Sequence, residues 1–208
     1  MSSFVEILLG TLAALIPIVN PFSTSSIFLS LTFLDSDHWR SKQALKGVFY
    51  MFLILVSFLL FGSFIINFFG ISLPGMRIAG GILLSRMAFN MLYTDEDLDS
   101  EDIKKHRLKK DIAFFPLAIP SLAGPGSIAL VISMGTFATG KLDYLAIICG
   151  ILLLSFVTYL TLRSATYFKK YFGEAGLKVM TKIMGFIIFC IGVQFVITGV
   201  TDLRLFGV

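Results

Sequence analysis

Two short segments, each with a proline near its centre, interrupt apolar stretches of the sequence and are its best candidates for binding chemistry. The residues concerned are Asn20, Pro21, Ser23 and Thr24 in the first segment, and Gly124, Pro125, Gly126 and Ser127 in the second. Proline lacks a backbone N–H and clashes with the carbonyl four residues earlier, so it interrupts a helix. The interruption leaves a helix N-terminus whose unpaired N–H groups attract a carboxylate, and freed carbonyls that attract an ammonium group. We therefore predict that these residues bind a substrate.

A plain proline kink, which is common in membrane helices, is the alternative for each break. Two breaks at matching places, one with a glycine on both sides of the proline, favour a binding site over two kinks. The hydroxyls of Ser23 and Thr24 could either cap the new helix or face a polar substrate, and the sequence leaves both possibilities open.

The residues usually needed for catalysis are badly placed for it. His38 and His106 fall in predicted loops, and no carboxylate falls within a predicted apolar core. Cys149 and Cys190 are too far apart for a redox pair and are expected to be small apolar side chains. We therefore expect that the protein is not an enzyme and that it has no cofactor and no metal site.

The composition indicates a membrane protein. Of 208 residues, 56% are hydrophobic and only 14% are charged, whereas about a quarter are charged in a soluble domain. A helix of about 20 apolar residues crosses the hydrocarbon core of a bilayer. We therefore predict an all-α membrane protein of about six transmembrane helices, with the first and fourth broken, at approximately 4–34, 45–69, 75–93, 112–137, 142–162 and 177–200.

Basic residues gather in alternate loops, which predicts the orientation of the chain. The loops after spans one, three and five hold Arg40, Lys42, Lys46, Lys104, Lys105, Arg107, Lys109, Lys110, Arg163, Lys169, Lys170, Lys178 and Lys182. The other side has only Arg77, Lys141 and Arg204. Because basic loops stay in the cytoplasm, both termini are expected outside it. This bias explains the net charge of +4 without a nucleic-acid partner, and the expected partner is the lipid bilayer.

The chain reads as a single transmembrane domain, 1–208, made of two similar halves. Residues 20–23 (NPFS) resemble 124–127 (GPGS), residues 77–80 (RIAG) resemble 182–185 (KIMG), and both pairs are separated by nearly the same interval. Repeat 1 covers about 1–93, a solvated cytoplasmic loop about 94–111, and repeat 2 about 112–208. Three spans per repeat place the second copy upside down, which is typical of secondary transporters.

Other polar and small residues within the predicted spans have two interpretations each. Arg86 could reach the cytoplasmic interface or contact a substrate carboxylate. Asn90 and Gln194, at near-equivalent places, could form interhelical hydrogen bonds or line a cavity. Gly185, Gly192 and Gly199 repeat every seven residues and predict a close helix–helix seam.

The sequence also resembles a known family. Residues 116–128 (PLAIPSLAGPGSI) resemble the signature of the MarC family of integral inner-membrane proteins, which includes the SnatA-type small neutral amino acid transporter. Asn20-Pro21 and residues 75–81 (GMRIAGG) are similar to its other signatures, although Ser23 stands where many members have glycine. The resemblance implies six spans, outward termini and transport of small neutral amino acids.

We therefore expect a secondary transporter of small neutral amino acids or similar metabolites in the cell inner membrane. Its small-molecule substrate would be a zwitterion bound at the two helix breaks. A channel or a non-transporting membrane scaffold is the alternative, and the sequence does not fix the oligomeric state.

Overall fold

The computed structural model describes residues 4–32, 35–93 and 111–205, and every regular element in these ranges is helical. The elements are α1 (Phe4–Val19), α2 (Pro21–Leu31), α3 (Asp37–Phe68), α4 (Leu73–Tyr93), the π-helical segment η1 (Ala113–Leu122), α6 (Pro125–Phe137), α7 (Lys141–Arg163) and α8 (Ala165–Leu205). Each of the six predicted segments is largely helical, although α3 and α8 begin earlier than the predicted 45 and 177.

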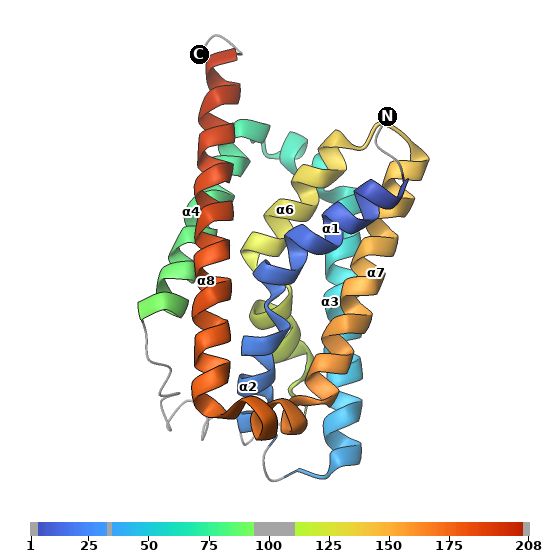
Figure 1. The fold of residues 1–208 in the computed structure, drawn as a ribbon. Coiled ribbons are helices and arrows are strands. Elements are labelled where there is room, and N and C mark those ends of the chain that lie inside the picture. Colours follow the sequence, from blue (N-terminus) through green and yellow to red (C-terminus); the bar gives the residue numbers. More distant parts are fainter. Residues whose placement is uncertain (1–3, 33–34, 94–110, 206–208) are drawn as a thin grey trace.

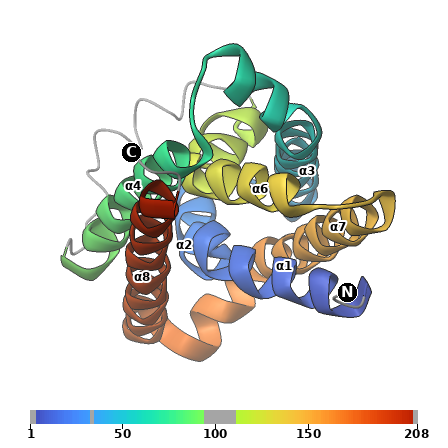
Figure 2. The same ribbon diagram turned by 90° about the horizontal axis from the view of Figure 1, so that it is seen from above.

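The long helices stand side by side and enclose the broken ones (Figures 1 and 2). α3 packs on α7 at one side of the molecule and α4 packs on α8 at the other. Between these pairs, α1 and α6 occupy the upper half of Figure 1, while α2 lies below them. The two proline-led helices, α2 and α6, therefore run away from the middle of the molecule in opposite directions.

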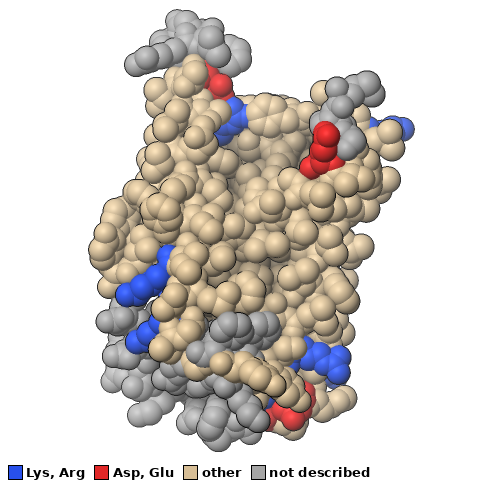
Figure 3. Space-filling model, viewed as in Figure 1, with Lys and Arg blue, Asp and Glu red and all other residues tan. Residues whose placement is uncertain are grey.

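Among the described residues, length and apolar character qualify three continuous helices as membrane spans. These are α3, α7 and the Lys178–Leu203 part of α8, and the pair α1–α2, bent by 47°, makes a fourth if it counts as one span. On the face shown in Figure 3, acidic side chains appear only near the two ends, and Lys and Arg side chains lie near the upper end and in the lower half, with a band free of charged side chains between them. A polytopic all-helical membrane protein is confirmed, while six spans in two inverted repeats stays a prediction.

The first predicted break is present, and Asn20 forms it. Asn20 has a left-handed backbone (φ 43°, ψ 68°), and Pro21 starts α2 in the first-turn position that suits proline. Asparagine adopts this conformation more readily than most residues because its short side chain bonds locally. Here the Asn20 Oδ1 atom accepts a hydrogen bond from the Ser23 N–H at 3.3 Å, so it caps α2.

The second predicted break is also present, but the segment before it differs from the expected regular helix. Within η1, Phe115 and Ile119 have extended backbones (φ −131°, ψ 125° and φ −121°, ψ 127°). Each of them directly precedes a proline, Pro116 or Pro120, and a residue before proline is forced out of the helical region. α6 then begins at Pro125 with an extended Gly124 as its N-cap.

Glycines bring α4 and α8 into backbone contact, as the seven-residue spacing predicted. A Cβ atom added to Gly192 would lie 2.8 Å from the Gly81 carbonyl oxygen, and one on Gly199 would lie 2.9 Å from that of Pro74. A Cβ on Gly185 would lie 3.0 Å from the Cβ of Met91. We call this contact between α4 and α8 the glycine seam. No side chain fits between the two helices at these points.

α8 begins earlier than expected. Residues 165–177, predicted as a loop, are helical apart from a turn at Gly173 (φ 63°), and they run across the lower end of the molecule before the long part of α8 rises. Glycine takes a positive φ at no steric cost, so it permits this change of direction.

Candidate functional site

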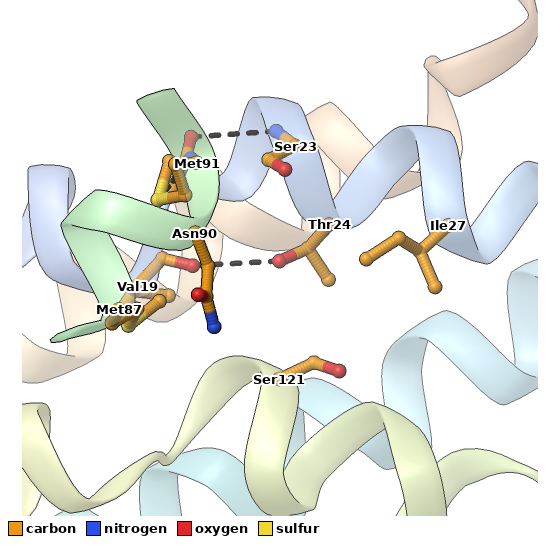
Figure 4. A pocket seen from close by; sticks show the side chains of 9 residues that line it. Val19, Ser23, Thr24, Ile27, Met87, Asn90, Met91 and Ser121 are labelled. Carbon is orange, nitrogen blue, oxygen red and sulfur yellow. Dashed lines mark hydrogen bonds between the residues drawn. The ribbon is translucent and has the colours of Figure 1, made fainter. Parts of the chain in front are cut away.

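A cavity of about 420 Å³ lies beside the first helix break (Figure 4). It is lined by Val19, Asn20, Ser23, Thr24, Ile27, Met87, Asn90, Met91 and Ser121. These residues come from the end of α1, the start of α2, the last turns of α4 and the end of η1. Its volume falls in the usual range for small-molecule pockets, roughly 300–1,000 Å³.

Asn20 supplies a hydrogen-bond donor to this cavity. Its side chain is buried, with 2% of the residue exposed, and its Oδ1 is used by the cap of α2. Its Nδ2 lies 4.0 Å from the sulfur of Met91, and a thioether is a weak acceptor. The Asn20 amide can therefore donate a strong hydrogen bond to a ligand oxygen, beside the N-terminus of α2 where negative charge is favoured.

Near the cavity, two hydroxyl groups donate hydrogen bonds to backbone carbonyls that lack their regular helical partner. Ser121 Oγ donates to the Pro116 carbonyl at 2.9 Å. In a regular α-helix that carbonyl would accept from the N–H of residue 120, which is absent because residue 120 is proline. Thr24 Oγ1 donates to the Val19 carbonyl at 3.5 Å. The Ser23 N–H, which would pair with that carbonyl in a regular helix, donates to Asn20 Oδ1 instead. Both hydroxyl oxygens keep lone pairs that can accept from a ligand ammonium group.

α4 provides the opposite wall. Met87, Asn90 and Met91 lie on one face because residues three and four apart are neighbours on a helix. The Asn90 amide points across the cavity toward Ser121 (Figure 4). Among the described residues, those that line the cavity carry no charge. The cavity combines neutral donors and acceptors with apolar side chains.

The structure brings together only part of the predicted binding set. Asn20, Ser23 and Thr24 line the cavity, whereas Pro21 is buried and is not part of the lining.

The residues of the second break lie outside this cavity. Gly126 is packed so closely that an added Cβ would lie 2.3 Å from Leu84 Cδ2. Ser127 is buried and donates to the Gly124 carbonyl at 2.9 Å. A binding role for Gly124, Pro125, Gly126 and Ser127 stays a prediction.

Of the other polar residues singled out in the predicted spans, Asn90 lines the cavity, whereas Arg86 and Gln194 do not. Arg86 is exposed on α4 and does not line the cavity. Gln194 is exposed and donates to Thr198 Oγ1 at 3.3 Å, so only Asn90 of that pair lines the cavity. Sequence reasoning missed Met87 and Met91, although their spacing from Asn90 would have placed them once Asn90 was assigned to the site.

Asp111, a carboxylate that lies just before η1, is held in an ion pair. Lys46 Nζ lies 2.8 Å from Asp111 Oδ2. The hydrogen bond from Lys46, with a second from the Ala113 N–H, lowers the pKa of Asp111 below its ordinary value. Asp111 therefore stays ionised near neutral pH and does not line the cavity.

A second charged contact, which the sequence did not reveal, lies at the end of the molecule where α4 begins. Arg77 is only 5% exposed and forms an ion pair with Asp202 of α8. Its Nε donates to Ser133 Oγ of α6 at 3.4 Å, and its guanidinium carbon lies 4.4 Å from the centre of the Phe137 ring. Sequence reasoning had used Arg77 as a loop-side positive charge and as part of the repeat and signature matches, without predicting this contact.

Long apolar helices, two proline-led breaks and a neutral cavity beside one of them define a polytopic membrane protein with a pocket for a small solute. Comparison with known proteins gives the family: residues 5–203 match the model of the MarC family integral membrane proteins. The chain belongs to the MarC family.

Its relatives are similar over nearly their full length. It is 33% identical to an inner membrane protein MarC of Citrobacter koseri, over 98% of this chain and 97% of that one. It is 35% identical to the inner membrane protein MarC of Escherichia coli O1:K1 and 34% identical to that of strain K12, over 92% of this chain and 93% of each relative. No solved structure matches.

Proposed function

We propose that this protein is a secondary transporter of small neutral amino acids, or of similar small zwitterions, across the cytoplasmic membrane. The observation that carries the proposal is the neutral polar cavity beside the break between α1 and α2. Asn20, Ser23 and Thr24 of its lining are buried, and a membrane protein has little reason to keep a buried amide and buried hydroxyls beside an open space unless a polar solute uses them. The resemblance to a family that includes an amino acid transporter supports the same conclusion.

The two ends of a zwitterion match different parts of the cavity. Its carboxylate would accept from Asn20 Nδ2 beside the positive N-terminus of α2. Its ammonium group would donate to the oxygen atoms of Thr24, Ser121 and Asn90. Since no charged side chain among the described lining residues awaits a charged substrate, a side chain without charge is expected.

The packing of the helices supports two inverted repeats. α1 packs against α7 as η1 packs against α3, and α2 packs against α7 and α8 as α6 packs against α3 and α4. The remaining large contacts, α3 with α7 and α4 with α8, join counterparts directly. Each broken element thus packs against helices of the other half, and the helices that its counterpart contacts are the equivalent ones.

Two glycines at equivalent places follow the same rule. A Cβ on Gly47 of α3 would lie 2.4 Å from Leu117 and 3.3 Å from the Ala113 carbonyl of η1. A Cβ on Gly150 of α7 would lie 2.8 Å from Thr11 and 3.0 Å from the Leu8 carbonyl of α1. In both halves a glycine on the second span lets the broken span of the other half approach closely.

The orientation proposed from the basic loops places the end of α4 in the cytoplasm, with both chain termini outside. Because Met87, Asn90 and Met91 belong to the last turns of α4, the cavity then lies in the cytoplasmic half of the membrane. The second break, 124–127, would contribute to the substrate path when the molecule opens to the other side. We propose no enzymatic step, since the described lining residues include no nucleophile–base pair.

Uptake and counterflow in proteoliposomes test this proposal. Purified protein should exchange labelled glycine or alanine and saturate with substrate, whereas aspartate, lysine and tryptophan should compete poorly. Asn90→Ala should reduce exchange, and Gln194→Ala, which removes an amide from an exposed position outside the cavity, should leave it unchanged. Lack of exchange for every small amino acid would contradict the proposal. Non-saturating conductance would instead indicate a channel, and neither activity a scaffold.

A further inference from the structure

Arg77 joins three helices at the end of the molecule where α4 begins, which we call the outer end. Its partners are Asp202 on α8, and Ser133 and Phe137 on α6. The guanidinium group is almost fully buried, so it has exchanged water for these partners. A buried charge that loses its partners costs several kcal/mol unless water can enter. Phe137 is 62% exposed and the Asp202 side chain is 24% exposed, so the cluster lies at the rim of the molecule. Separation of these contacts would admit water to the guanidinium group.

The same side of α6 is also closed by direct packing below Arg77. A Cβ on Gly80 of α4 would lie 2.9 Å from the Cβ of Ala129, and one on Gly126 would lie 2.3 Å from Leu84 of α4. Gly126, Ala129, Ser133 and Phe137 recur at helical spacing along α6, so they form one stripe that faces α4. The cavity at the first break has no opening through this stripe, because its lining includes no residue of α6.

The contacts of Arg77 differ in how easily they can separate. Arg77 and Asp202 both belong to the helices that the glycine seam locks together. α6 is the second half of a broken element, lies outside the glycine seam and packs closely on α3, and its N-terminus at Gly124 has no side-chain cap. Movement of α6 away from α4 would therefore break the contacts to Ser133 and Phe137 and leave the pair with Asp202 intact.

We infer that Arg77, positioned by Asp202, is the outer latch of the transport path and holds α6 closed against α4 through Ser133 and Phe137. This inference rests on the proposed function, because a latch is needed only where the molecule opens alternately to its two sides. Release of α6 would let water reach the guanidinium group and open the stripe 126–137 to the outer side.

The latch can be tested by the accessibility of a cysteine on the stripe, without measuring transport. Ala129→Cys is introduced into a chain in which Cys149 and Cys190 are replaced by serine. A membrane-impermeant maleimide is then applied to right-side-out and inside-out vesicles. In the parent, labelling should be slow from both sides. The double variant Ser133→Ala/Phe137→Leu and the single variant Asp202→Asn should be labelled several-fold faster from the outer side only.

Asp143→Asn is the matched control, because it removes another carboxylate near the same end that binds Thr139 rather than Arg77. It should leave labelling unchanged. The inference is overturned if both latch variants are labelled at the parental rate, or if Asp143→Asn accelerates labelling equally. Gel filtration of each variant separates loss of the latch from misfolding, and Ser133→Ala/Phe137→Leu keeps the buried ion pair so that a folded variant remains.

The same experiment distinguishes failure of the latch from failure of the proposed function. Faster labelling of the latch variants in a protein that carries no amino acid would leave the latch in place and remove the transport proposal. Unchanged labelling in a protein that exchanges glycine would remove the latch alone.

Discussion

Asn20 combines a backbone requirement with the amide group that we propose binds the substrate. Its left-handed conformation ends α1, its Oδ1 caps α2, and its Nδ2 donates to the sulfur of Met91, which also lines the cavity. Few residues meet the first two needs, and of those that do, only asparagine also offers an amide donor. The fold and the chemistry of the site therefore depend on one side chain, and substitutions can separate the two roles.

Asn20→Asp should fold but lose binding. Aspartate tolerates the left-handed conformation and can cap α2, yet it replaces the donor that faces the cavity with a carboxylate that repels a substrate carboxylate. The lost hydrogen bond to a charged group is worth about 1.5–3 kcal/mol, so affinity should fall about tenfold or more. Counterflow measures the affinity and thermal unfolding in detergent measures stability. Asn20→Ala should instead lose about 1 kcal/mol of stability through the missing cap.

Asp111 should not carry a coupled proton. Hydrogen bonds from Lys46 and the Ala113 N–H lower its pKa, so any stability that it contributes is present above the pKa of the unfolded chain. That contribution is lost only as the pH falls below the ordinary carboxyl range and through the lowered folded pKa. Uptake by Asp111→Asn should therefore follow the pH dependence of the parent around neutrality. A pH dependence that disappears in Asp111→Asn would assign the coupled proton to this carboxylate.

At the scale of the elements, the two breaks share a proline but differ in construction. α2 is capped by a side chain and borders the cavity, whereas α6 starts at an uncapped glycine and packs against Leu84. In the proposed function, the first is a binding element in this conformation and the second is a closing one.

Gly126 should tolerate substitution only if Leu84 is replaced by a smaller residue. A Cβ atom on Gly126 would lie 2.3 Å from Leu84 Cδ2, so even alanine does not fit beside the present Leu84 side chain. Gly126→Ala should therefore destabilise the protein by about 1–3 kcal/mol through overpacking. Gly126→Ala/Leu84→Ala should recover part of that loss in thermal unfolding. Gly10→Ala, where no atom lies within 4 Å of the added Cβ, should be harmless, and equal loss in both single variants would contradict the packing explanation.

The sequence predicted the elements better than their contacts. Prolines and uncharged runs are local signals, so both breaks and the glycine seam could be predicted. The extended backbones at Phe115 and Ile119 follow from the prolines after them, and the same rule could have found them. The position of Ser121 opposite Asn90, or of Arg77 between Asp202 and Ser133, depends on which faces of distant helices meet. No local sequence pattern indicates which of these faces meet.

At the scale of the whole molecule, the proposed orientation in the membrane rests on the basic residues that gather in the predicted loops and near the ends of α3, α7 and α8. The basic loops predict both ends of the chain on the outer side. Reporter fusions at Ser2 and at Val208 should both report that side, and two cytoplasmic reports would overturn the orientation of the cavity and of the latch. Moving lysines into the loop at 69–72 should weaken the preference and give mixed reports.

The glycine seam also has a consequence for how the protein is made. α4 enters the membrane before α6 and α7 are made, but the partner that fits its glycine-lined face is α8, the last of the described helices. Until α8 has been made, that face is exposed to lipid or to whatever chaperone or insertase stands beside it. Completion of the glycine seam therefore waits for the synthesis of α8, and a message truncated before α8 should yield a product that quality-control proteases recognise.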